Sequence, residues 1–489
     1  MKFKTSFENP NSKSNVDILA NKLPDFSNNL FSVVVNNLIG KVDYIQNQNR
    51  ESVEIEFFDT TLRDGDQSPG NAFTEAEKLY FAKRLSDAGF HFIEAGFPAS
   101  HGDVTDKIAH QVDLQNSKLV GLARLHQEDI SACKIALETL PDGQGVVHCF
   151  VATSPKHREL KLKGIDIEKI IENMNNFLGE IDQNKYKVMF SLEDATNTPD
   201  CDLRKVIEAA VRLGVDYINI PDTVGTAQPF EVERLIKKVM IYVLSAKRRA
   251  GIEKEIKVFY HGHNDLDNAV ANTMAALRAG AHPQGTINGC GERAGNVSLF
   301  DIICNILARP ELYGKYIINI DIGQLFGIIQ EIDEKLGTKY SEEIQKRFLH
   351  TSGIHQAYIA QEVSKAIEDK KIKHKIMGGF IYKPDENGKY TQVKFSDIYL
   401  PLNGHAIGCE PKDYGIILSK HSGIKAVKAI FMLRGYEFCD DYQLEQVNKY
   451  IHKYAIKKLE SDQGKISKRT IDDIDIITIA KKFKLKSVN

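Results

Sequence analysis

The sequence lacks the features that would place the protein in a membrane, in an oxidising compartment or on a nucleic acid. No stretch of its 489 residues approaches the roughly 20 apolar residues that a membrane helix needs. Its seven cysteines form no CxxC pair, which argues against a disulfide framework and against a structural zinc knuckle. The formal net charge is −2, so no overall basic field points to nucleic acid or to a membrane surface. We therefore expect a cytoplasmic protein that binds neither a membrane nor a nucleic acid.

We also expect no signal or transit peptide at the N-terminus. Its first residues, MKFKTSFENPNSKSN, contain no apolar signal core and carry too much Asn and acid for a transit peptide. One apolar patch follows, NLFSVVVNNLIG at 29–40. We predict that residues 1–50 form an N-terminal extension that docks through this patch.

From residue 53 onward, eight short β-rich runs alternate with helical patterns. The stretches 74–89 and 202–214 fit a 3.6-residue period, and the second ends at a glycine. This rhythm predicts an α/β fold, a (β/α)8 TIM barrel over residues 51–315. A doubly wound open sheet is the alternative, but the first run leads into DTTLRDGDQ rather than into a glycine-rich phosphate loop. The predicted strands are 53–59, 91–97, 118–123, 146–152, 187–193, 216–222, 256–262 and 285–291.

After the barrel, the pattern predicts small mixed and helical C-terminal subdomains. Residues 316–435 form a linker helix, at 318–337, and a mixed subdomain with a hairpin at 378–395 that turns at its Asn-Gly. Residues 436–489 form a helical subdomain, with two charged amphipathic helices within 441–489.

Polar side chains gather where the predicted strands end, which is where the active sites of such barrels lie. His261 and His263 are two residues apart on one strand, so both can face the barrel mouth. The pair alone can also be two hydrogen-bonded histidines at a strand end. Asp64 and Asn296 add oxygens from neighbouring strands, and two nitrogens with two oxygens suit a divalent ion such as Mg, Mn, Co or Zn.

Arg63 precedes Asp64 in the glycine-containing turn LRDGDQSPG. An ion pair between the two neighbours would explain one charge beside one metal ligand. It would not explain why Arg, Asp and Gln cluster in the same turn. Because an arginine beside a metal is well suited to stabilise a developing oxyanion, we predict a catalytic role for Arg63.

Seven motifs carry most of these polar residues. They are DTTLRDGDQSPG (59–70), GLARLHQEDI (121–130), FVATSPKH (150–157), FSLEDATNTP (190–199), INIPDTVG (218–225), HGHNDL (261–266) and NGCGERAGN (288–296). In order and spacing they resemble the 2-isopropylmalate synthase family, which belongs to the metal-dependent Claisen-condensing barrel enzymes together with homocitrate and citramalate synthases. The resemblance covers roughly residues 53–440, since HTSGIHQ (350–356) and SKHSGIKAV (419–427) look like the family's post-barrel subdomains.

The resemblance implies a role for each matching residue. The residues that match the family's metal ligands are Asp64, His261, His263 and Asn296. The predicted catalytic residues are Arg63, Glu193, His355 and Tyr399. The predicted substrate-binding residues are Ser191, Asn219, Thr223 and His148. In the family, the histidine that His355 matches often comes from the partner chain, so a homodimer is expected.

The resemblance also implies the reaction. Acetyl-CoA would condense with a 2-oxo acid, most directly 3-methyl-2-oxobutanoate to give 2-isopropylmalate, and the thioester would then be hydrolysed. The oxo acid would chelate the divalent ion, and Arg63 would stabilise the alkoxide. His355 is the first candidate for the base, because an imidazole titrates near neutrality, and Glu193 is the second. His355 can also be a hinge or interface histidine.

The chain departs from the usual family pattern after three strands. The positions are Thr196, Asn197, Thr226, Asp267 and Asn268. We expect them to surround the pocket, which leaves the side chain of the oxo acid open. Only residues 436–489 follow Gly435, too few for the family's leucine-sensing domain of about a hundred residues, so we expect no such domain and no leucine feedback by that route.

Three alternatives stay open at this point. One is a homocitrate, citramalate or other alkylmalate synthase. Another is an acyl-CoA lyase that runs the reverse carbon–carbon cleavage, which RDGDQSPG and the long post-barrel region disfavour. The last is a degenerate barrel kept as a binding module, which the full ligand set and Arg63 disfavour.

Overall fold

The structure of the protein is a computed structural model that describes residues 52–70, 72–368, 375–377, 380–384, 390–392, 407–409, 415–461 and 470–487. The chain divides into two compact units, Met1–Asp321 and Ile322–Asn489. The extension predicted at residues 1–50 lies outside the described residues.

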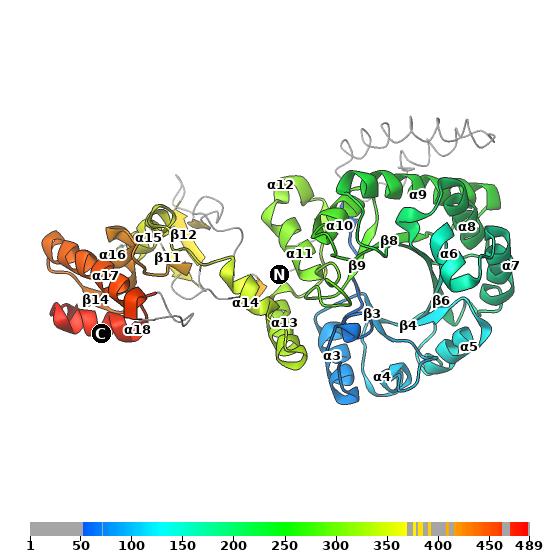
Figure 1. The fold of residues 1–489 in the computed structure, drawn as a ribbon, viewed down its shortest axis with the longest axis horizontal. Helices are drawn as coiled ribbons and strands as arrows, with labels where there is room; N and C mark the ends of the chain where they lie inside the picture. Colours follow the sequence, from blue (N-terminus) through cyan, green and yellow to red (C-terminus); the bar gives the residue numbers. More distant parts are fainter. Residues whose placement is uncertain are drawn as a thin grey trace. The chain divides into compact units, whose positions relative to one another are not determined.

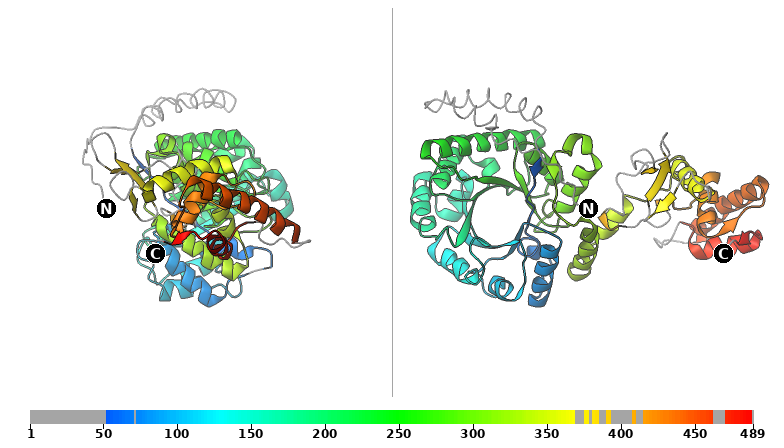
Figure 2. Two further views of the ribbon diagram at one scale, coloured as in Figure 1. Left: turned by 90° about the vertical axis from the view of Figure 1, so that its left-hand side faces the viewer. Right: turned by 180° about the vertical axis from the view of Figure 1, so that it is seen from behind.

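Eight parallel strands close into a barrel in the first unit, which confirms the predicted fold class (Figure 1). The strand order follows the sequence, and β2 pairs with β9 to close the ring. Figure 2 shows the same ring from behind, with the helices outside it. The barrel strands are β2 (Phe58–Asp59), β3 (Phe92–Gly96), β4 (Lys118–Arg124), β5 (Gly145–Ala152), β6 (Tyr186–Glu193), β7 (Tyr217–Asp222), β8 (Lys257–Gly262) and β9 (His282–Gly285).

Local capping signals set the bounds of the barrel helices. Helix α3 (Glu75–Asp87) begins at Thr74, whose side chain accepts a hydrogen bond from the backbone N–H of Glu77 in a capping box. Helix α9 (Pro229–Ala250) ends at Gly251, which takes the left-handed conformation with φ 67°. The remaining helical segments are η1 (Gly65–Gln67), α4 (Thr105–Gln111), α5 (Gln127–Ala136), α6 (Pro155–Leu162), α7 (Ile167–Leu178), η2 (Ala195–Asn197), α8 (Asp200–Arg212), α10 (Ala269–Arg278), α11 (Leu299–Ala308) and α12 (Pro310–Tyr313).

The first predicted strand is split in two. Its start, β1 (Val53–Glu54), pairs with β10 (Tyr316–Ile317) and not with the barrel. Only Phe58–Asp59 joins the ring, where it pairs with β3 and β9. The single apolar run at 53–59 therefore serves two sheets, and its pattern alone does not mark the change of partner.

The eighth strand was predicted at 285–291, and this was wrong. The strand is His282–Gly285, and the chain beyond it forms a loop in which Thr286 N–H donates to the carbonyl of Val297 at 3.1 Å. The sequence HPQG has no β-branched residue, and Pro283 has no N–H to donate, so it carries little strand signal. The β-rich pattern that follows it belongs to the loop.

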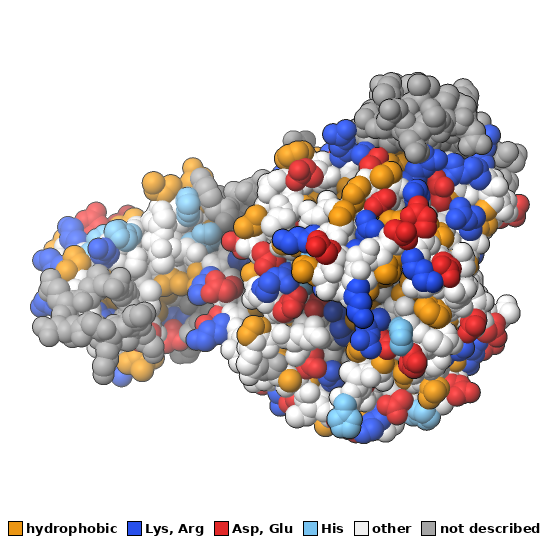
Figure 3. Space-filling view, turned by 45° about the vertical axis from the view of Figure 1, so that its right-hand side comes forward, with side chains coloured by type: hydrophobic (Ala, Val, Ile, Leu, Met, Phe, Trp, Pro, Cys, Tyr) orange, Lys and Arg blue, Asp and Glu red, His pale blue; other side chains and the backbone are white. Residues whose placement is uncertain are grey.

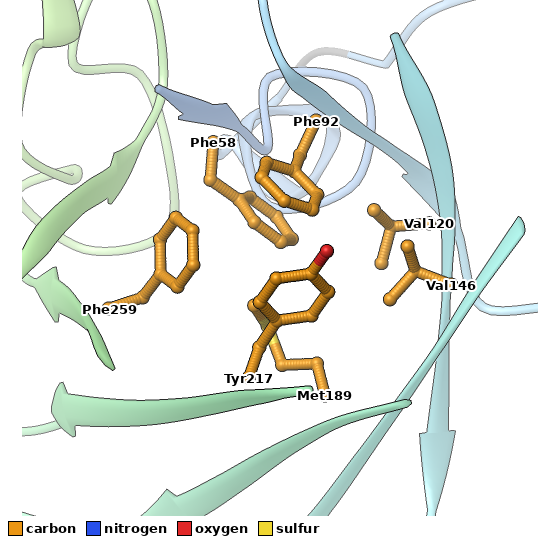
Figure 4. Packing of buried hydrophobic residues seen from close by; sticks show 7 residues of the cluster. All are labelled: Phe58, Phe92, Val120, Val146, Met189, Tyr217 and Phe259. Carbon is orange, nitrogen blue, oxygen red and sulfur yellow. The ribbon is translucent and has the colours of Figure 1, made fainter. Parts of the chain in front are cut away.

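The floor of the barrel interior is apolar (Figure 4). Seven strands each contribute one buried side chain to it: Phe58, Phe92, Val120, Val146, Met189, Tyr217 and Phe259. Phe92 stacks on Phe58 and meets Phe259 edge-on, both with ring centroids 5.3 Å apart. Because side chains alternate direction along a strand, the residues two positions further on also point inward and lie above this floor.

The second unit combines helices with short strands. The helix predicted at 318–337 is α13 (Ile322–Leu336), and the two predicted C-terminal helices are α17 (Asp441–Ser461) and α18 (Asp473–Lys482). The predicted hairpin is confirmed by the antiparallel pair β12 (Phe380–Pro384) and β13 (Tyr390–Gln392), and its turn lies outside the described residues. The other elements are α14 (Tyr340–Lys346), α15 (Gly353–Glu368), β11 (Lys375–Met377), α16 (Ile424–Leu433), β14 (Tyr436–Glu437) and β15 (Lys486–Ser487).

The surface of the barrel unit carries charges of both signs. Lys and Arg side chains are interspersed with Asp and Glu over the face that Figure 3 shows. Within the described residues, no helix offers an apolar span that could cross a membrane.

The apolar floor predicts that truncating one of its side chains lowers the stability of the fold far more than truncating an exposed side chain. We expect Phe259→Ala to lower the free energy of unfolding by about 3–5 kcal/mol, because it removes a fully buried ring and leaves a cavity. Phe230→Ala is the matched control, since Phe230 is 72% exposed, and it should stay within about 0.5 kcal/mol of the parent. Denaturant unfolding measures both, and equal losses in the two variants would contradict this account of the floor.

Candidate functional site

A layer of mostly polar side chains lies directly above the apolar floor. We name it the polar layer, and it consists of Thr60, Glu94, His148, Ser191, Asn219, His261 and Gln284. Six of its members stand two residues after a floor residue in the sequence, and Gln284 on β9 is in register with His261 on β8. Each is at most 5% exposed. The strand period therefore concentrates buried polar groups at one height in the barrel.

Glu94 holds Arg63 and His148 in place. Its Oε2 accepts hydrogen bonds from Thr60 Oγ1 at 2.6 Å and from Arg63 Nε at 2.8 Å. Its Oε1 lies 2.6 Å from Nδ1 of His148. Burial alone would raise the pKa of Glu94, but the charges of Arg63 and His148 and the hydrogen bonds lower it to about 2. The carboxylate is therefore ionised and fixes the guanidinium of Arg63.

The hydrogen bonds continue around the barrel from His148. Its Nε2 lies 2.7 Å from Ser191 Oγ, and Asn219 Nδ2 donates to Ser191 Oγ at 2.8 Å and to Gln284 Oε1 at 2.7 Å. All four side chains line one cavity. Asn219 Oδ1 and Gln284 Nε2 are buried and have no hydrogen-bond partner among the described residues. They leave one acceptor and one donor for polar groups of a ligand.

Three of the predicted metal ligands converge. Asp64, His261 and His263 offer ligand atoms that all lie within 4.8 Å of one another. Asp64 Oδ2 is 3.2 Å from His261 Nε2, which is 3.3 Å from His263 Nε2. Burial, followed by the neighbouring His261, lowers the pKa of His263 to about 3, so its ring is neutral near neutral pH. Burial would raise the pKa of Asp64, but Arg63 and His261 hold it well below its usual range.

Asn296 lies beside this triad. Its backbone forms an isolated antiparallel bridge with His263. Its Nδ2 donates to the carbonyl of Cys290 at 3.2 Å, which leaves Oδ1 buried and without a hydrogen-bond partner among the described residues. Two imidazoles, one carboxylate and one uncommitted amide oxygen fit the donor preferences of a divalent cation.

Arg63 links the triad to the polar layer. Its guanidinium contacts Asp64 Oδ1 at 3.1 Å and Glu94 Oε2 at 2.7 Å, and its side chain is 16% exposed. Burial would lower the pKa of Arg63, but the two carboxylates raise it, so the charge is kept. The ion pair that the sequence left as an alternative therefore exists, and it does not prevent the charge from facing the cavity that Arg63 lines.

The cavity above the polar layer has a volume of about 530 Å³, which is in the usual range for small-molecule sites. Besides Arg63 and the triad, it is lined by the apolar side chains of Leu122, Phe150 and Pro221. It therefore places the polar corner that contains the candidate metal ligands next to apolar walls.

Glu193 and Thr223 also line this cavity. Glu193 Oε1 lies 3.1 Å from Nδ1 of His157 and accepts a hydrogen bond from Lys161. Thr223 Oγ1 accepts a hydrogen bond from the backbone N–H of Asp194 at 3.0 Å. Both predicted residues are thus at the cavity, each held by a partner from a neighbouring segment.

Arg293 ties together three loops at the barrel mouth. Its Nε and one terminal nitrogen donate to the two carboxylate oxygens of Asp265 at 2.8 and 3.0 Å. The same terminal nitrogen donates to the carbonyl of Thr223 at 2.9 Å. Because these loops follow β7, β8 and β9, the contacts support the segments that carry Thr223, His263 and Asn296.

The five positions that depart from the family pattern do not line the cavity, so the expectation that they surround the pocket was wrong. These residues are Thr196, Asn197, Thr226, Asp267 and Asn268. Thr196 Oγ1 donates to Asp222 at 3.1 Å, and Asn197 Nδ2 donates to Asp194 at 2.8 Å. Asp267 takes the left-handed conformation with φ 58°. These contacts shape the loops rather than the ligand space.

Two predicted catalytic residues belong to the second unit of the chain. His355 is exposed at the start of α15 in the second unit, with its ring 6.3 Å from that of His350. Tyr399 lies outside the described residues. Their catalytic roles stay predictions.

Sequence reasoning missed Glu94 and Gln284. Glu94 lies within the apolar run HFIEAGF, where an acid two residues after the inward-facing Phe92 signals a buried and paired carboxylate. Gln284 lies in the strand whose bounds were misplaced. If the strand bounds had been predicted correctly, the two-residue alternation of side chains would have shown that both residues point into the barrel.

The barrel is similar to a known protein family and to solved structures. The HMGL-like family model matches residues 54–332, which include the whole barrel. The crystal structure of hydroxymethylglutaryl-CoA lyase from Pseudomonas aeruginosa has a TM-score of 0.49 at 19% identity, over 60% of this chain and 99% of that one.

Curated proteins match over more of the chain. The 2-isopropylmalate synthase of Sulfurisphaera tokodaii is 32% identical over 442 residues, which are 89% of this chain and 98% of that protein. The 2-isopropylmalate synthase of Methylacidiphilum infernorum is 38% identical over 305 residues. The aligned region spans 61% of this chain but only 58% of the length of that relative.

The buried carboxylate of Glu94 predicts a pH-dependent contribution to stability. Its pKa of about 2 in the folded protein lies below its ordinary value of 4.5, so the contribution is complete above pH 4.5 and is lost as the pH falls towards 2. We expect Glu94→Gln to lower the unfolding free energy by about 3 kcal/mol at neutral pH, because Arg63 loses a buried partner.

Denaturant unfolding at a series of pH values measures this difference, which should shrink steadily below about pH 4.5. Glu253→Gln, at an exposed loop position, is the control and should stay within about 0.5 kcal/mol of the parent. A Glu94→Gln difference that does not change with pH would contradict the assignment.

Proposed function

The chain belongs to the HMGL-like family and, within it, to the 2-isopropylmalate synthase family, and from this premise we propose that it condenses acetyl-CoA with a 2-oxo acid. The product would be an alkylmalate, released after hydrolysis of the thioester. The observation that carries the proposal is the convergence of Asp64, His261 and His263 beside the charged Arg63 in one cavity.

A divalent ion such as Mg, Mn, Co or Zn is the proposed cofactor, held by Asp64, His261, His263 and Asn296. When bound, it would polarise the ketone of the oxo acid as a Lewis acid. Nitrogen and oxygen donors without a thiolate support a catalytic rather than a structural ion. Neutral imidazoles need no deprotonation before they bind a cation, which the low pKa of His263 favours.

Arg63 is the proposed group that stabilises negative charge on the former ketone oxygen. Its guanidinium is held from two sides, by Asp64 and Glu94, so it need not reorganise when that charge develops. Donors fixed in advance in a water-poor cavity contribute most to such stabilisation.

A base must remove a proton from the acetyl methyl group, so that the resulting carbanion can attack the ketone carbon. We propose Glu193 or His355 for this step. Glu193 lines the cavity, but Lys161 and His157 share its Oε1, which disfavours proton capture at that oxygen. His355 is exposed on α15 and would have to reach a barrel from outside it, as the proposed homodimer would allow.

The apolar walls favour a branched aliphatic oxo acid. Leu122, Phe150 and Pro221 line the cavity that contains the metal donors, and they would bury the methyl groups of 3-methyl-2-oxobutanoate. We therefore propose 2-isopropylmalate as the product, in a cytoplasmic enzyme of leucine biosynthesis. The proposed subdivision of the chain is a catalytic barrel over residues 51–315, followed in the sequence by a mixed subdomain at 316–435 and a helical subdomain at 436–489.

A thiol-release assay tests the reaction. With acetyl-CoA, a panel of 2-oxo acids and a divalent metal, we expect coenzyme A release to be fastest with 3-methyl-2-oxobutanoate and to stop after chelation. Mass spectrometry should identify 2-isopropylmalate as the product. No release with any oxo acid would overturn the proposed function, and faster release with another oxo acid would overturn only the substrate.

Arg63→Gln tests the role of the guanidinium. We expect kcat to fall by about 10²–10³-fold, because the substitution removes a fixed charge at the developing oxyanion. Metal content should stay unchanged, since Arg63 is not among the proposed ligands. Arg212→Gln, on the exposed end of α8, is the matched control. A kcat for Arg63→Gln close to that of the control, at full metal content, would contradict the role.

A further inference from the structure

The first barrel strand depends on groups outside its own pairing. β2 contributes only two residues to the ring and is the shortest of the eight barrel strands. The chain that leads into it changes partner on the way. Val53 and Ile55 donate their backbone N–H groups to the segment that contains β10, and the paired residues of the ring begin at Phe58. Glu56 and Phe57 fall between the two sheets, so their N–H groups need acceptors from elsewhere.

Two histidine rings supply these acceptors. The backbone N–H of Glu56 donates to Nδ1 of His282 at 3.0 Å, and that of Phe57 donates to Nδ1 of His91 at 3.2 Å. His91 immediately precedes β3 and His282 begins β9, so each ring comes from one of the two strands that flank β2. We name His91 and His282 the histidine clasp. It holds the chain from both sides at the point where the chain enters the ring.

The clasp can act only while its rings are neutral. A ring nitrogen that accepts a hydrogen bond carries no proton, so both imidazoles must have their proton on Nε2. A protonated imidazole presents an N–H at both nitrogens and would face the backbone donor with a second donor. Phe57 is fully buried, so its N–H would then lose its partner where water cannot replace it.

Charged groups from four neighbouring segments face the clasp. Glu54 on β1 lies 3.8 Å from Nε2 of His91, and the carboxylate of Glu56 pairs with Lys257 on β8 at 2.9 Å. Both acids favour protonation of the rings, whereas Lys257 and Lys118, on β4, oppose it. A charge on His91 also opposes one on its partner in the clasp. The charges around the rings therefore largely offset one another.

Burial sets the pH range in which the clasp holds. It lowers the pKa of both rings, and that of His282 falls from an ordinary value of 6.5 to about 4. Above pH 6.5 the rings are neutral whether the segment is bound or released, so the clasp contributes fully to stability. As the pH falls below 6.5, the released segment gains protons that the bound one does not take up. The contribution is therefore lost progressively towards pH 4.

We propose that His91 and His282 form an acid-sensitive clasp, whose protonation releases residues 54–57 and loosens β2 while the other barrel strands stay folded. With only two residues in the ring, β2 has few hydrogen bonds of its own to hold it. The chain continues from β2 into the turn that carries Arg63 and Asp64, so the release reaches the candidate site. The clasp does not depend on the proposed reaction, because neither histidine lines the cavity.

Hydrogen exchange followed by mass spectrometry tests the clasp at about pH 7.5 and about pH 5. The protection factor is the ratio of the intrinsic to the measured exchange rate, which removes the direct effect of pH on exchange. We expect protection of residues 53–59 to fall at least about 10-fold at the lower pH, since one unit of pKa difference corresponds to a factor of ten. Protection of Gly145–Ala152, which form β5, should change by less than about threefold.

The double variant His91→Asn with His282→Asn separates titration from packing. The side-chain oxygen of asparagine can accept a backbone hydrogen bond but does not titrate, so the ratio of protection between the two pH values should approach one. His110→Asn, at an exposed position of α4, is the matched control and should keep the loss seen in the parent. A parent without the loss, or a double variant that shows the same loss as the parent, would overturn the clasp.

Nitrogen-15 chemical shifts of labelled histidines give a second measurement on the parent protein, should the double variant not fold. They report which ring nitrogen carries the proton, and the single variants His91→Asn and His282→Asn assign the two signals. We expect both rings to carry the proton on Nε2 at neutral pH and His282 to stay neutral at about pH 5. A proton on Nδ1 of either ring at neutral pH, or titration of His282 near pH 6.5, would overturn the clasp.

Discussion

The two-residue alternation of the barrel strands is the constraint on which the site depends. Once Phe58, Phe92, Val146 and their counterparts fill the floor, the residues two positions further must also point inward. At that height most strands have polar residues in place of aliphatic ones, and these residues form a continuous hydrogen-bonded series from Thr60 to Gln284. The apolar floor thus fixes the height of the polar layer, and the polar layer supports the cavity above it.

Ion pairs between buried charges connect the polar layer to the candidate metal site. Glu94 is fully buried, and a carboxylate in such a place needs a partner whose own charge is permanent. Arg63 provides it and contacts Asp64 with the same guanidinium. The arginine therefore has two roles: it compensates two buried carboxylates, and it keeps a positive charge at the edge of the cavity. In this arrangement the structural ion pair and the proposed oxyanion contact use different donors of one planar group.

Local signals made the barrel and the convergence of Asp64, His261 and His263 predictable, whereas features that depend on strand register were not. Asp64, His261 and His263 stand at strand ends, so spacing and fold class together brought them to one edge. Glu94 resembles one more residue of an apolar run until the inward direction of Phe92 is known. The last strand, HPQG, is held by its neighbours β2 and β8 rather than by its own propensity. Asp267 was wrongly expected at the pocket, because the sequence pattern does not reveal the conformation of its loop, in which Asp267 takes the left-handed region.

The central claim is that this barrel holds a divalent cation on two imidazoles and oxygen donors beside Arg63. X-ray absorption spectroscopy of the zinc- or cobalt-loaded protein tests it most directly. The account predicts one ion per chain, a first shell of nitrogen and oxygen only, and the multiple-scattering signature of two imidazoles, of which one disappears in His263→Ala. A shell that contains sulfur, or a spectrum that is the same in His263→Ala, would contradict it.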